Sequence, residues 1–164
     1  MGGEVPISGT DPDFRLKTGF GGLDIFLSKF DLDGNYQWGH RIGGITFDCA
    51  NSLAVSGNGN VYITGYFQDI VDFDPGPSSD LKEALSSYDI FLSKFGFNGS
   101  YFGTKTWGNT YWGSGLDSWG LVTNNFDFVF LTGSFGFTVD FDPSSYGTDY
   151  RTSNGSTDIF LMGL

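Results

Sequence analysis

The chain repeats its own strand motifs at long and nearly constant intervals, and this repetition limits the folds that are open to it. An Asp-Ile-Phe-Leu segment begins at Asp24, again at Asp89 and again at Asp158. The first two copies lie 65 residues apart (24 to 89) and the last two lie 69 apart (89 to 158). A Val-Asp-Phe-Asp-Pro segment occurs at 71–75 and returns at 139–143. Because these landmarks keep one order, the sequence predicts tandem structural units.

Each unit has the pattern of short strands separated by turn residues. We expect strands at 25–30 and 36–42, joined by Asp33-Gly34-Asn35, because Gly and Asn accept the positive φ that tight turns require. A second predicted hairpin joins 52–56 to 61–67. The 26 glycines and the aromatic content of 18% also favour β structure. Helix is expected only as a turn or two at 80–86.

A unit of four short strands cannot cover its own apolar faces, so such units have to stack, as in a propeller or a solenoid. The sequence therefore predicts an all-β, propeller-like fold of tandem four-stranded antiparallel units of about 65–69 residues. We expect one domain, 1–164, with a partial unit at 1–50, a full unit at about 51–115 and a partial unit at about 116–164. Two and a half units do not close a ring, so the propeller is predicted to be incomplete as a single chain.

The chain resembles the SBBP β-propeller repeat family of bacterial surface and secreted proteins. The resemblance is carried by residues 57–65 (Gly-Asn-Gly-Asn-Val-Tyr-Ile-Thr-Gly), the strand type at 24–30, the turn at 33–35 and the Gly43-Gly44 end. It spans nearly the whole chain and implies a propeller fold and an extracellular or cell-surface location in a bacterium. The units of this chain are longer than the family pattern and carry the Asp-Phe-Asp-Pro insertion. The first residues have no basic region followed by an apolar one, so we expect no export signal within this chain.

The net charge of the chain argues against two classes of binding partner. Nineteen acidic side chains against eight basic ones give a formal net charge of −11, which repels nucleic acid and anionic membrane surfaces. No stretch approaches the roughly 20 apolar residues of a membrane helix, so membrane insertion is not expected either.

Acidic residues in turns are the candidate metal ligands. The Asp31–Asn35 turn resembles the start of a Ca²⁺ loop but lacks the later bidentate Glu, and a hairpin turn is the alternative that we favour. Two acidic pairs recur in equivalent places, where a structural strand end before Pro is favoured over a cation site and over an acid–base pair for glycosidic bonds. No cofactor is expected to be required, with Ca²⁺ as the one candidate ion. The candidate ligands are Asp31, Asp33, Asn35, Asp72, Asp74, Asp140 and Asp142.

Other reactive residues do not form a recognisable catalytic pattern. His40 is the only histidine and Cys49 the only cysteine, and we interpret them as a surface imidazole and a small buried thiol. The four tryptophans and eight tyrosines can build sugar-stacking platforms, but we favour a role in the β core. Asn98 and Asn154 fit the N-glycosylation pattern, which in a bacterium usually marks only a turn. The chain is not expected to be an enzyme.

These observations favour a non-enzymatic structural or assembly protein at the cell exterior. We expect copies to associate head to tail as a homo-oligomer or filament, because the last strand lacks the hairpin partner that the earlier units provide. The residues expected at this contact are Asp158, Ile159, Phe160 and Leu161. The alternative is a carbohydrate- or protein-binding module, Ca²⁺-assisted or not. A carboxylate-based glycoside hydrolase is the third and least favoured class.

Overall fold

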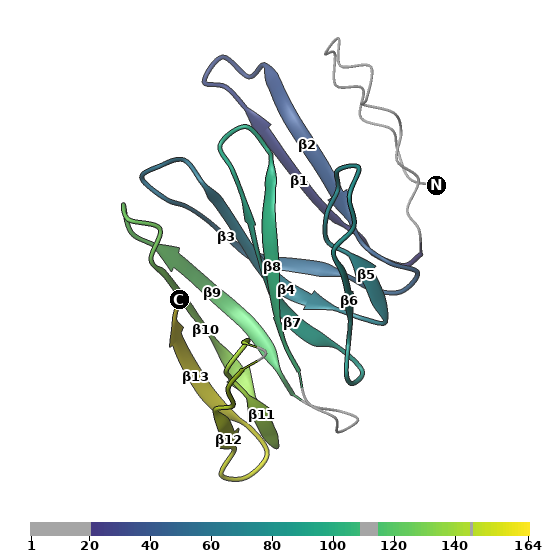
Figure 1. Ribbon diagram of the computed structural model, residues 1–164, viewed down its shortest axis with the longest axis vertical. Helices are drawn as coiled ribbons and strands as arrows, with labels where there is room; N and C mark the ends of the chain where they lie inside the picture. The colour runs from purple at the N-terminus through teal and green to yellow at the C-terminus, as the bar shows by residue number, and fades with distance from the viewer. Residues whose placement is uncertain (1–20, 109–114, 145) are drawn as a thin grey trace.

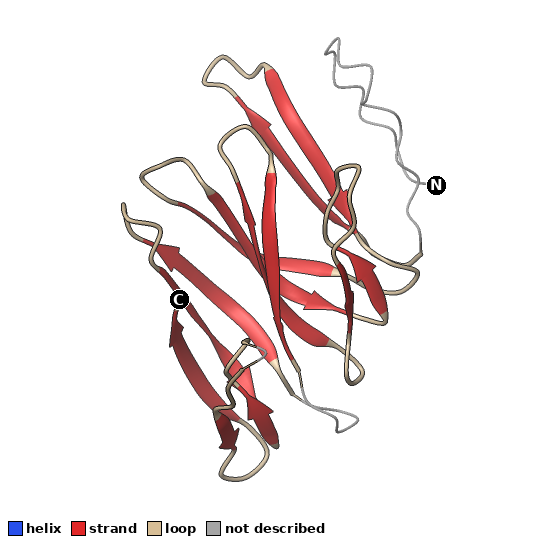
Figure 2. Cartoon of the chain, in the orientation of Figure 1, coloured by secondary structure: helices blue, strands red, loops and turns tan. Residues whose placement is uncertain are grey.

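A computed structural model describes residues 21–108, 115–144 and 146–164, and these residues are built from β-strands and loops without helix (Figure 2). The strands are β1 Ile25–Phe30, β2 Tyr36–Ile42, β3 Cys49–Val55, β4 Val61–Phe67, β5 Ile70–Asp72, β6 Leu81–Glu83, β7 Asp89–Phe95, β8 Tyr101–Trp107, β9 Asp117–Thr123, β10 Val129–Phe135, β11 Thr138–Asp140, β12 Tyr150–Thr152 and β13 Asp158–Gly163. The all-β prediction is confirmed.

Three larger antiparallel sheets are built from equivalent strands of the repeat. The middle sheet has four strands in the order β3-β4-β7-β8. The N-terminal sheet is the pair β1-β2, and the C-terminal sheet has the order β13-β10-β9. In the repeat, β1 and β13 correspond to β7, β2 corresponds to β8, and β9-β10 correspond to β3-β4. The predicted hairpins of the first and second units therefore lie where the turn residues place them.

The three sheets stack face to face, and the middle sheet is covered on both sides (Figure 1). One core lies between the N-terminal and middle sheets and includes Ile25, Leu27, Phe91 and Phe95. The second core lies between the middle and C-terminal sheets and includes Ile90, Leu92, Trp107, Leu131 and Phe160. Successive residues of β7 thus alternate between the two cores, as the period of two along a strand requires.

The Asp-Phe-Asp-Pro insertion forms a small hairpin in each of the two units that carry it. Strands β5 and β6 pair in one unit, and β11 and β12 pair in the next. Val71 and Phe73 are both fully buried in the first core, and the Phe73 ring lies 5.0 Å from that of Phe91. In the second unit the carbonyl of Phe141 accepts a hydrogen bond from Trp107 Nε1 at 3.1 Å. The insertion therefore fills the space between adjacent sheets.

The structure corrects the expected helical turn and shows how far the propeller-like arrangement extends. The helical turn predicted at 80–86 is wrong, because β6 occupies Leu81–Glu83 and pairs with β5. Within the described ranges the three sheets form an open stack and no closed propeller (Figure 1). In that same part of the chain, no helix is long and apolar enough to span a membrane.

The stacking predicts that equivalent phenylalanines contribute very differently to stability. Phe91 is fully buried between two sheets, whereas Phe26, its counterpart in the N-terminal sheet, is 58% exposed. We expect Phe91→Ala to lower the free energy of unfolding by about 3–5 kcal/mol because it leaves a cavity. Phe26→Ala should cost about 1 kcal/mol or less. Urea unfolding at low protein concentration measures both, and equal losses would contradict the stacking.

Candidate functional site

The first candidate metal turn is closed by its own carboxylate. Asp31 Oδ1 accepts the backbone N–H groups of Asp33 at 3.0 Å and Asn35 at 2.8 Å, and its Oδ2 accepts Asn35 Nδ2 at 2.9 Å. These bonds, led by that from the Asn35 side chain, hold the pKa of Asp31 below its ordinary value. Gly34 supplies the positive φ of 84° that the turn needs. The carboxylate of Asp31 therefore serves as the cap of the β1–β2 turn.

The repeated acidic pairs close the loop that joins the two strands of each inserted hairpin. Asp72 Oδ1 accepts the N–H of Asp74 at 3.1 Å and that of Asp80 at 2.9 Å, and its Oδ2 accepts the Ser79 hydroxyl at 2.9 Å. The second unit repeats this arrangement, since Asp140 Oδ1 accepts the N–H of Asp142 at 3.1 Å and of Asp149 at 2.7 Å. A carboxylate that binds two backbone N–H groups on opposite sides of a loop fixes that loop.

The second member of each pair caps the turn that follows. Asp74 Oδ1 accepts the Gly76 N–H, and Asp142 Oδ1 accepts the Ser144 N–H, both at 2.8 Å. Ser144 holds the pKa of Asp142 below its ordinary value. Among the described residues, no three His, Cys, Asp or Glu side chains are grouped so as to hold a metal ion. The geometry of both pairs accounts for their repetition without an ion.

This arrangement predicts that Asp72 stabilises the fold in the absence of calcium. We expect Asp72→Ala to lower the free energy of unfolding by about 1–3 kcal/mol, because two backbone N–H groups lose their acceptor. Asp74→Ala, the matched control, should cost less because one N–H is affected. Thermal unfolding with EDTA or with added Ca²⁺ should leave the midpoint of the unmodified protein unchanged. A midpoint that falls with EDTA as much as with Asp72→Ala would assign the carboxylate to a metal.

Asp89, which begins the central copy of the Asp-Ile-Phe-Leu motif, is a buried acid. Asp89 is only 2% exposed, and its carboxylate accepts hydrogen bonds from the Leu85 N–H at 2.9 Å and from the Ser86 hydroxyl at 3.4 Å. Burial raises the pKa of Asp89 to about 6, against the effect of these hydrogen bonds. The folded protein therefore binds a proton at Asp89 more tightly than the unfolded chain does.

Asp89 predicts a specific dependence of stability on pH. Below about pH 4 the group is protonated in both states, and above about pH 6 it is ionised while buried, so its contribution is lost as the pH rises between these values. Relative to Asp89→Asn, the unmodified protein should lose about 2–3 kcal/mol of unfolding free energy across this range. Chemical unfolding at several pH values measures the difference. Asp158→Asn, at the equivalent but partly exposed position, is the control, and a loss of the same size there would contradict the assignment.

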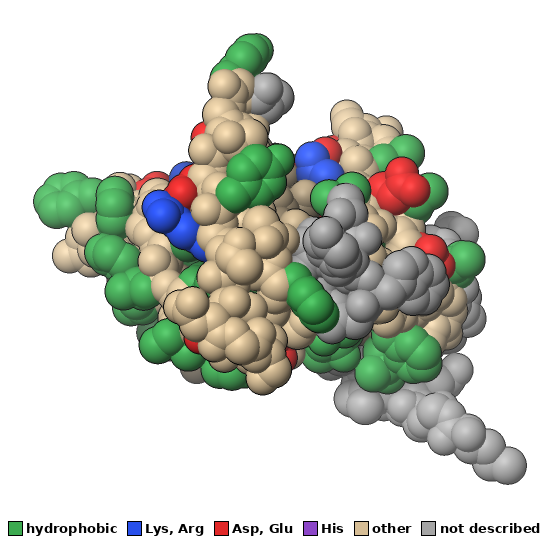
Figure 3. All heavy atoms as spheres, turned by 90° about the horizontal axis from the view of Figure 1, so that it is seen from below, with side chains coloured by type: hydrophobic (Ala, Val, Ile, Leu, Met, Phe, Trp, Pro, Cys, Tyr) green, Lys and Arg blue, Asp and Glu red, His purple; other side chains and the backbone are tan. Residues whose placement is uncertain are grey.

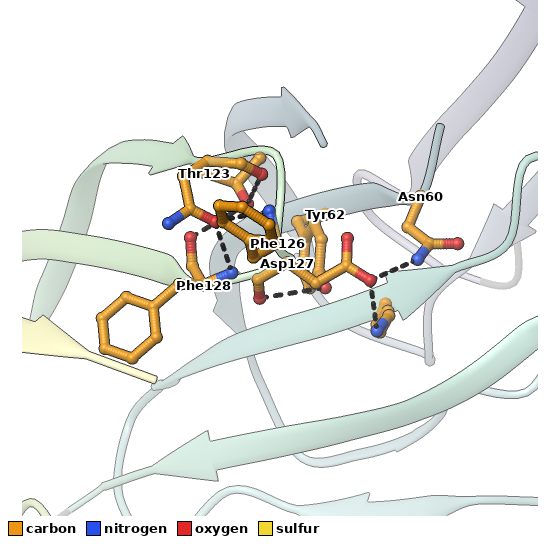
Figure 4. Close-up of polar contacts among 8 residues, drawn as sticks. Asn60, Tyr62, Thr123, Phe126, Asp127 and Phe128 are labelled. Atoms are coloured by element: carbon orange, nitrogen blue, oxygen red, sulfur yellow. Dashed lines mark hydrogen bonds and ion pairs between the residues drawn. The ribbon is translucent and has the colours of Figure 1, made fainter. Parts of the chain in front are cut away.

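Polar side chains at the ends of the strands fix how the middle and C-terminal sheets are stacked. Asp127 adopts a left-handed backbone conformation (φ 63°) and turns toward the middle sheet. Its Oδ2 accepts Asn60 Nδ2 at 2.7 Å and lies 3.4 Å from Lys94 Nζ, and its carbonyl accepts the Tyr62 hydroxyl at 3.5 Å (Figure 4). The Ser56 hydroxyl, followed by Asn60 and Lys94, holds the pKa of Asp127 below its ordinary value.

The seam between the N-terminal and middle sheets has its own polar contacts. Lys29 Nζ and Trp38 Nε1 both donate to the carbonyl of Phe97, at 2.7 and 3.1 Å. His40 lies 2.6 Å from the Gly99 carbonyl through Nε2, and its ring stacks on Trp38 and Phe95. The interpretation of His40 as a surface imidazole is therefore wrong, because the ring lies between two sheets.

The remaining sequence candidates lie apart from one another. Cys49 is half-buried rather than fully buried, and its thiol lies near the Ala50 carbonyl and the Asn51 side chain. Asn98 caps the β7–β8 turn by accepting the Ser100 N–H and hydroxyl. Asn154 lies in an exposed loop and donates its N–H to Asp158 at 2.8 Å. Glycosylation at the two asparagines stays a prediction.

The outward faces of the two end sheets are among the places that carry exposed apolar side chains. The outer face of the C-terminal sheet carries Val122, Phe130, Ile159 and Leu161, which are 59%, 41%, 81% and 72% exposed. Figure 3 shows hydrophobic side chains on its left, the side on which this sheet lies in Figure 1. The outer face of the N-terminal sheet carries Phe26 and Phe30, which are 58% and 41% exposed. Phe91 and Phe95, which are the counterparts of Phe26 and Phe30 in the middle sheet, are buried.

The four residues expected at a self-association contact divide into two pairs. Ile159 and Leu161 belong to the outer face of the C-terminal sheet. Phe160 is only 8% exposed and packs in the second core, so it is not available for contact. Asp158 holds the preceding loop through Asn154. Sequence reasoning also missed Val122 and Phe130, which the period-two alternation along β9 and β10 places on the same face.

Comparison with known proteins places the chain near one larger protein. No family model matches the chain, so its resemblance to the SBBP repeats stays a prediction. A 77-residue part, 47% of the chain, is 31% identical to part of the regulatory protein FlaEY of Caulobacter vibrioides. The chain spans only about 8% of the length of that relative. The aligned part is slightly longer than one repeat unit, and it is a similarity to a short portion of a long protein.

Proposed function

We propose that the chain is a non-enzymatic assembly module of a bacterial cell-surface or secreted structural protein, built from propeller-like units. Copies associate head to tail and complete each other's stack of sheets. The observation that carries this proposal is the contrast between equivalent positions of the repeat. Ile90 and Leu92 are 0% and 6% exposed in the middle sheet, whereas Ile159 and Leu161 are 81% and 72% exposed in the C-terminal sheet, at the end of the stack.

The edge of β13 supports the same proposal. Val129 and Leu164 exchange backbone hydrogen bonds in both directions, at 2.9 and 2.8 Å. In an antiparallel ladder such reciprocal pairs alternate, so Phe160 and Met162 also face β10. The backbone groups of Ile159 and Leu161 consequently point to the other edge, where the described residues place no strand. In the middle sheet this same edge is occupied by β8.

A binding module for carbohydrate or for another protein is the second candidate. It is favoured by the exposed aromatic side chains of the C-terminal sheet, where Trp119 is 57% exposed and the rings of Phe128 and Phe130 lie 5.2 Å apart. Such rings can stack on sugars or pack against apolar side chains. A monomeric protein whose tryptophan fluorescence responds to a glycan would favour this candidate over assembly.

The proposal predicts self-association that depends on the β13 edge. By light scattering, the mass should exceed that of the 17.9 kDa monomer and rise with concentration. Leu161→Pro removes an N–H at the free edge but leaves the β10 ladder in place, so it should shift the protein toward monomer. Leu161→Val keeps the N–H and is the matched control. A wild-type protein that stays monomeric at every concentration would overturn the proposed function. A Leu161→Pro protein that assembles normally would exclude the β13 edge as a site of self-association.

A further inference from the structure

We infer that the outer face of the C-terminal sheet docks onto the outer face of the N-terminal sheet of a second copy of this chain. This inference rests on the proposed function and names the surfaces that carry it. It concerns the broad faces of the sheets, which are separate from the strand edge of β13.

The repeat shows what such a contact looks like when it is filled. At each of the two seams, one sheet presents an Ile and a Leu two residues apart, and the next sheet presents phenylalanine from the same motif. Ile25 and Leu27 share the first core with Phe91 and Phe95, and Ile90 and Leu92 share the second core with Phe160. The motif therefore carries both halves of one apolar contact on its two faces.

Among the residues that the structure describes, the two outer faces carry the halves of this contact that are left unfilled. Ile159 and Leu161 repeat the Ile and Leu of the filled seams, and Phe26 and Phe30 repeat Phe91 and Phe95. All four are exposed, whereas their counterparts in the middle sheet are at most 6% exposed. The two faces lie at opposite ends of the stack (Figure 1). A second copy of this chain thus brings the side-chain types that the existing seams use.

The C-terminal outer face also lacks the polar groups that the inner seam has to pair. Asn51, Asn60 and Lys94 reach across that seam to Asp117 and Asp127. The corresponding positions of the C-terminal sheet hold Trp119, Phe128 and Gly163. Burying this face therefore leaves no side-chain charge at these positions without a partner, which is the main cost of covering a polar surface.

Because the contact joins two different surfaces, it is heterologous, and it yields a ring if the rotation between copies closes and a filament if it does not. Such a contact has a consequence that an isologous contact lacks. Two variants, each blocked on a different face, can still bind each other through their remaining intact faces.

The test uses Phe130→Glu and Phe26→Glu, which place a charge on one outer face each. Phe130 lies on the central strand β10, so its replacement leaves the β13 edge unchanged. Each variant alone should associate at least about tenfold more weakly than the unmodified protein. An equimolar mixture should form a two-chain species and grow no further, because each chain then has one blocked face. Light scattering and sedimentation measure both results.

Two controls keep the test decisive. Leu81→Glu replaces an apolar side chain that is 64% exposed outside both outer faces, and it should associate like the unmodified protein. Circular dichroism checks that each variant is folded, and Val122→Glu, on the same face but on β9, replaces Phe130→Glu if the latter fails to fold.

Three results would overturn the inference. A mixture that stays monomeric would exclude a heterologous contact between these faces. Single variants that assemble normally, beside a Leu161→Pro protein that does not, would assign assembly to the edge alone and leave the proposed function intact. If the unmodified protein is monomeric and binds a glycan or another protein through Phe130, that ligand and not a second copy occupies the outer face. This result would overturn the proposed function as well.

Discussion

Burial of small sheets against one another is the interaction on which the rest of this structure depends. No sheet in the described residues has more than four strands, and an isolated sheet of this size leaves one or both of its faces in water. The middle sheet avoids this because both of its faces are covered, and its strand β7 holds Ile90, Phe91 and Phe95 fully buried. The same motif in β1 and β13 is buried on one face only. Exposed apolar surface at the ends is therefore a direct consequence of how the stack is built.

The acidic residues are best understood through the same stack. Covering two faces with short strands requires many tight turns and inserted hairpins, and each of these leaves backbone N–H groups to be paired. Asp31, Asp72 and Asp140 accept two such groups each. Three of the nineteen acidic side chains are used in this way. A negative charge that first suggests a cation site thus has a structural role at these positions, while Asp127 joins neighbouring sheets through Asn60 and Lys94.

The proposed assembly through stacked sheets needs no enclosed reactive centre. The repeated motifs of the chain lie in the turns, at the contacts between sheets and on the faces of the sheets. His40 contacts the Gly99 carbonyl of the neighbouring sheet, and Trp107 donates a hydrogen bond to the Phe141 carbonyl of an inserted hairpin. The similarity to FlaEY covers a short portion of that protein, slightly longer than one unit. Under the proposed function, the outer faces are the surfaces that a second copy of the chain covers.

The sequence by itself determined the β class, the repeat and the hairpins, because alternation of apolar residues and Gly or Asn at turns act over a few neighbouring residues. It also correctly placed the strands at 25–30, 36–42 and 61–67. It did not distinguish Phe91 from Phe26 or Leu92 from Leu161, since these residues have the same local sequence. Their burial differs by more than half of their surface because the neighbouring sheet is present in one case and absent in the other. The same reason applies to the helical turn expected at 80–86, where Leu81–Glu83 instead form β6 because β5 lies beside them. Burial on a given face is a property of what packs against it, and only the tertiary structure decides that.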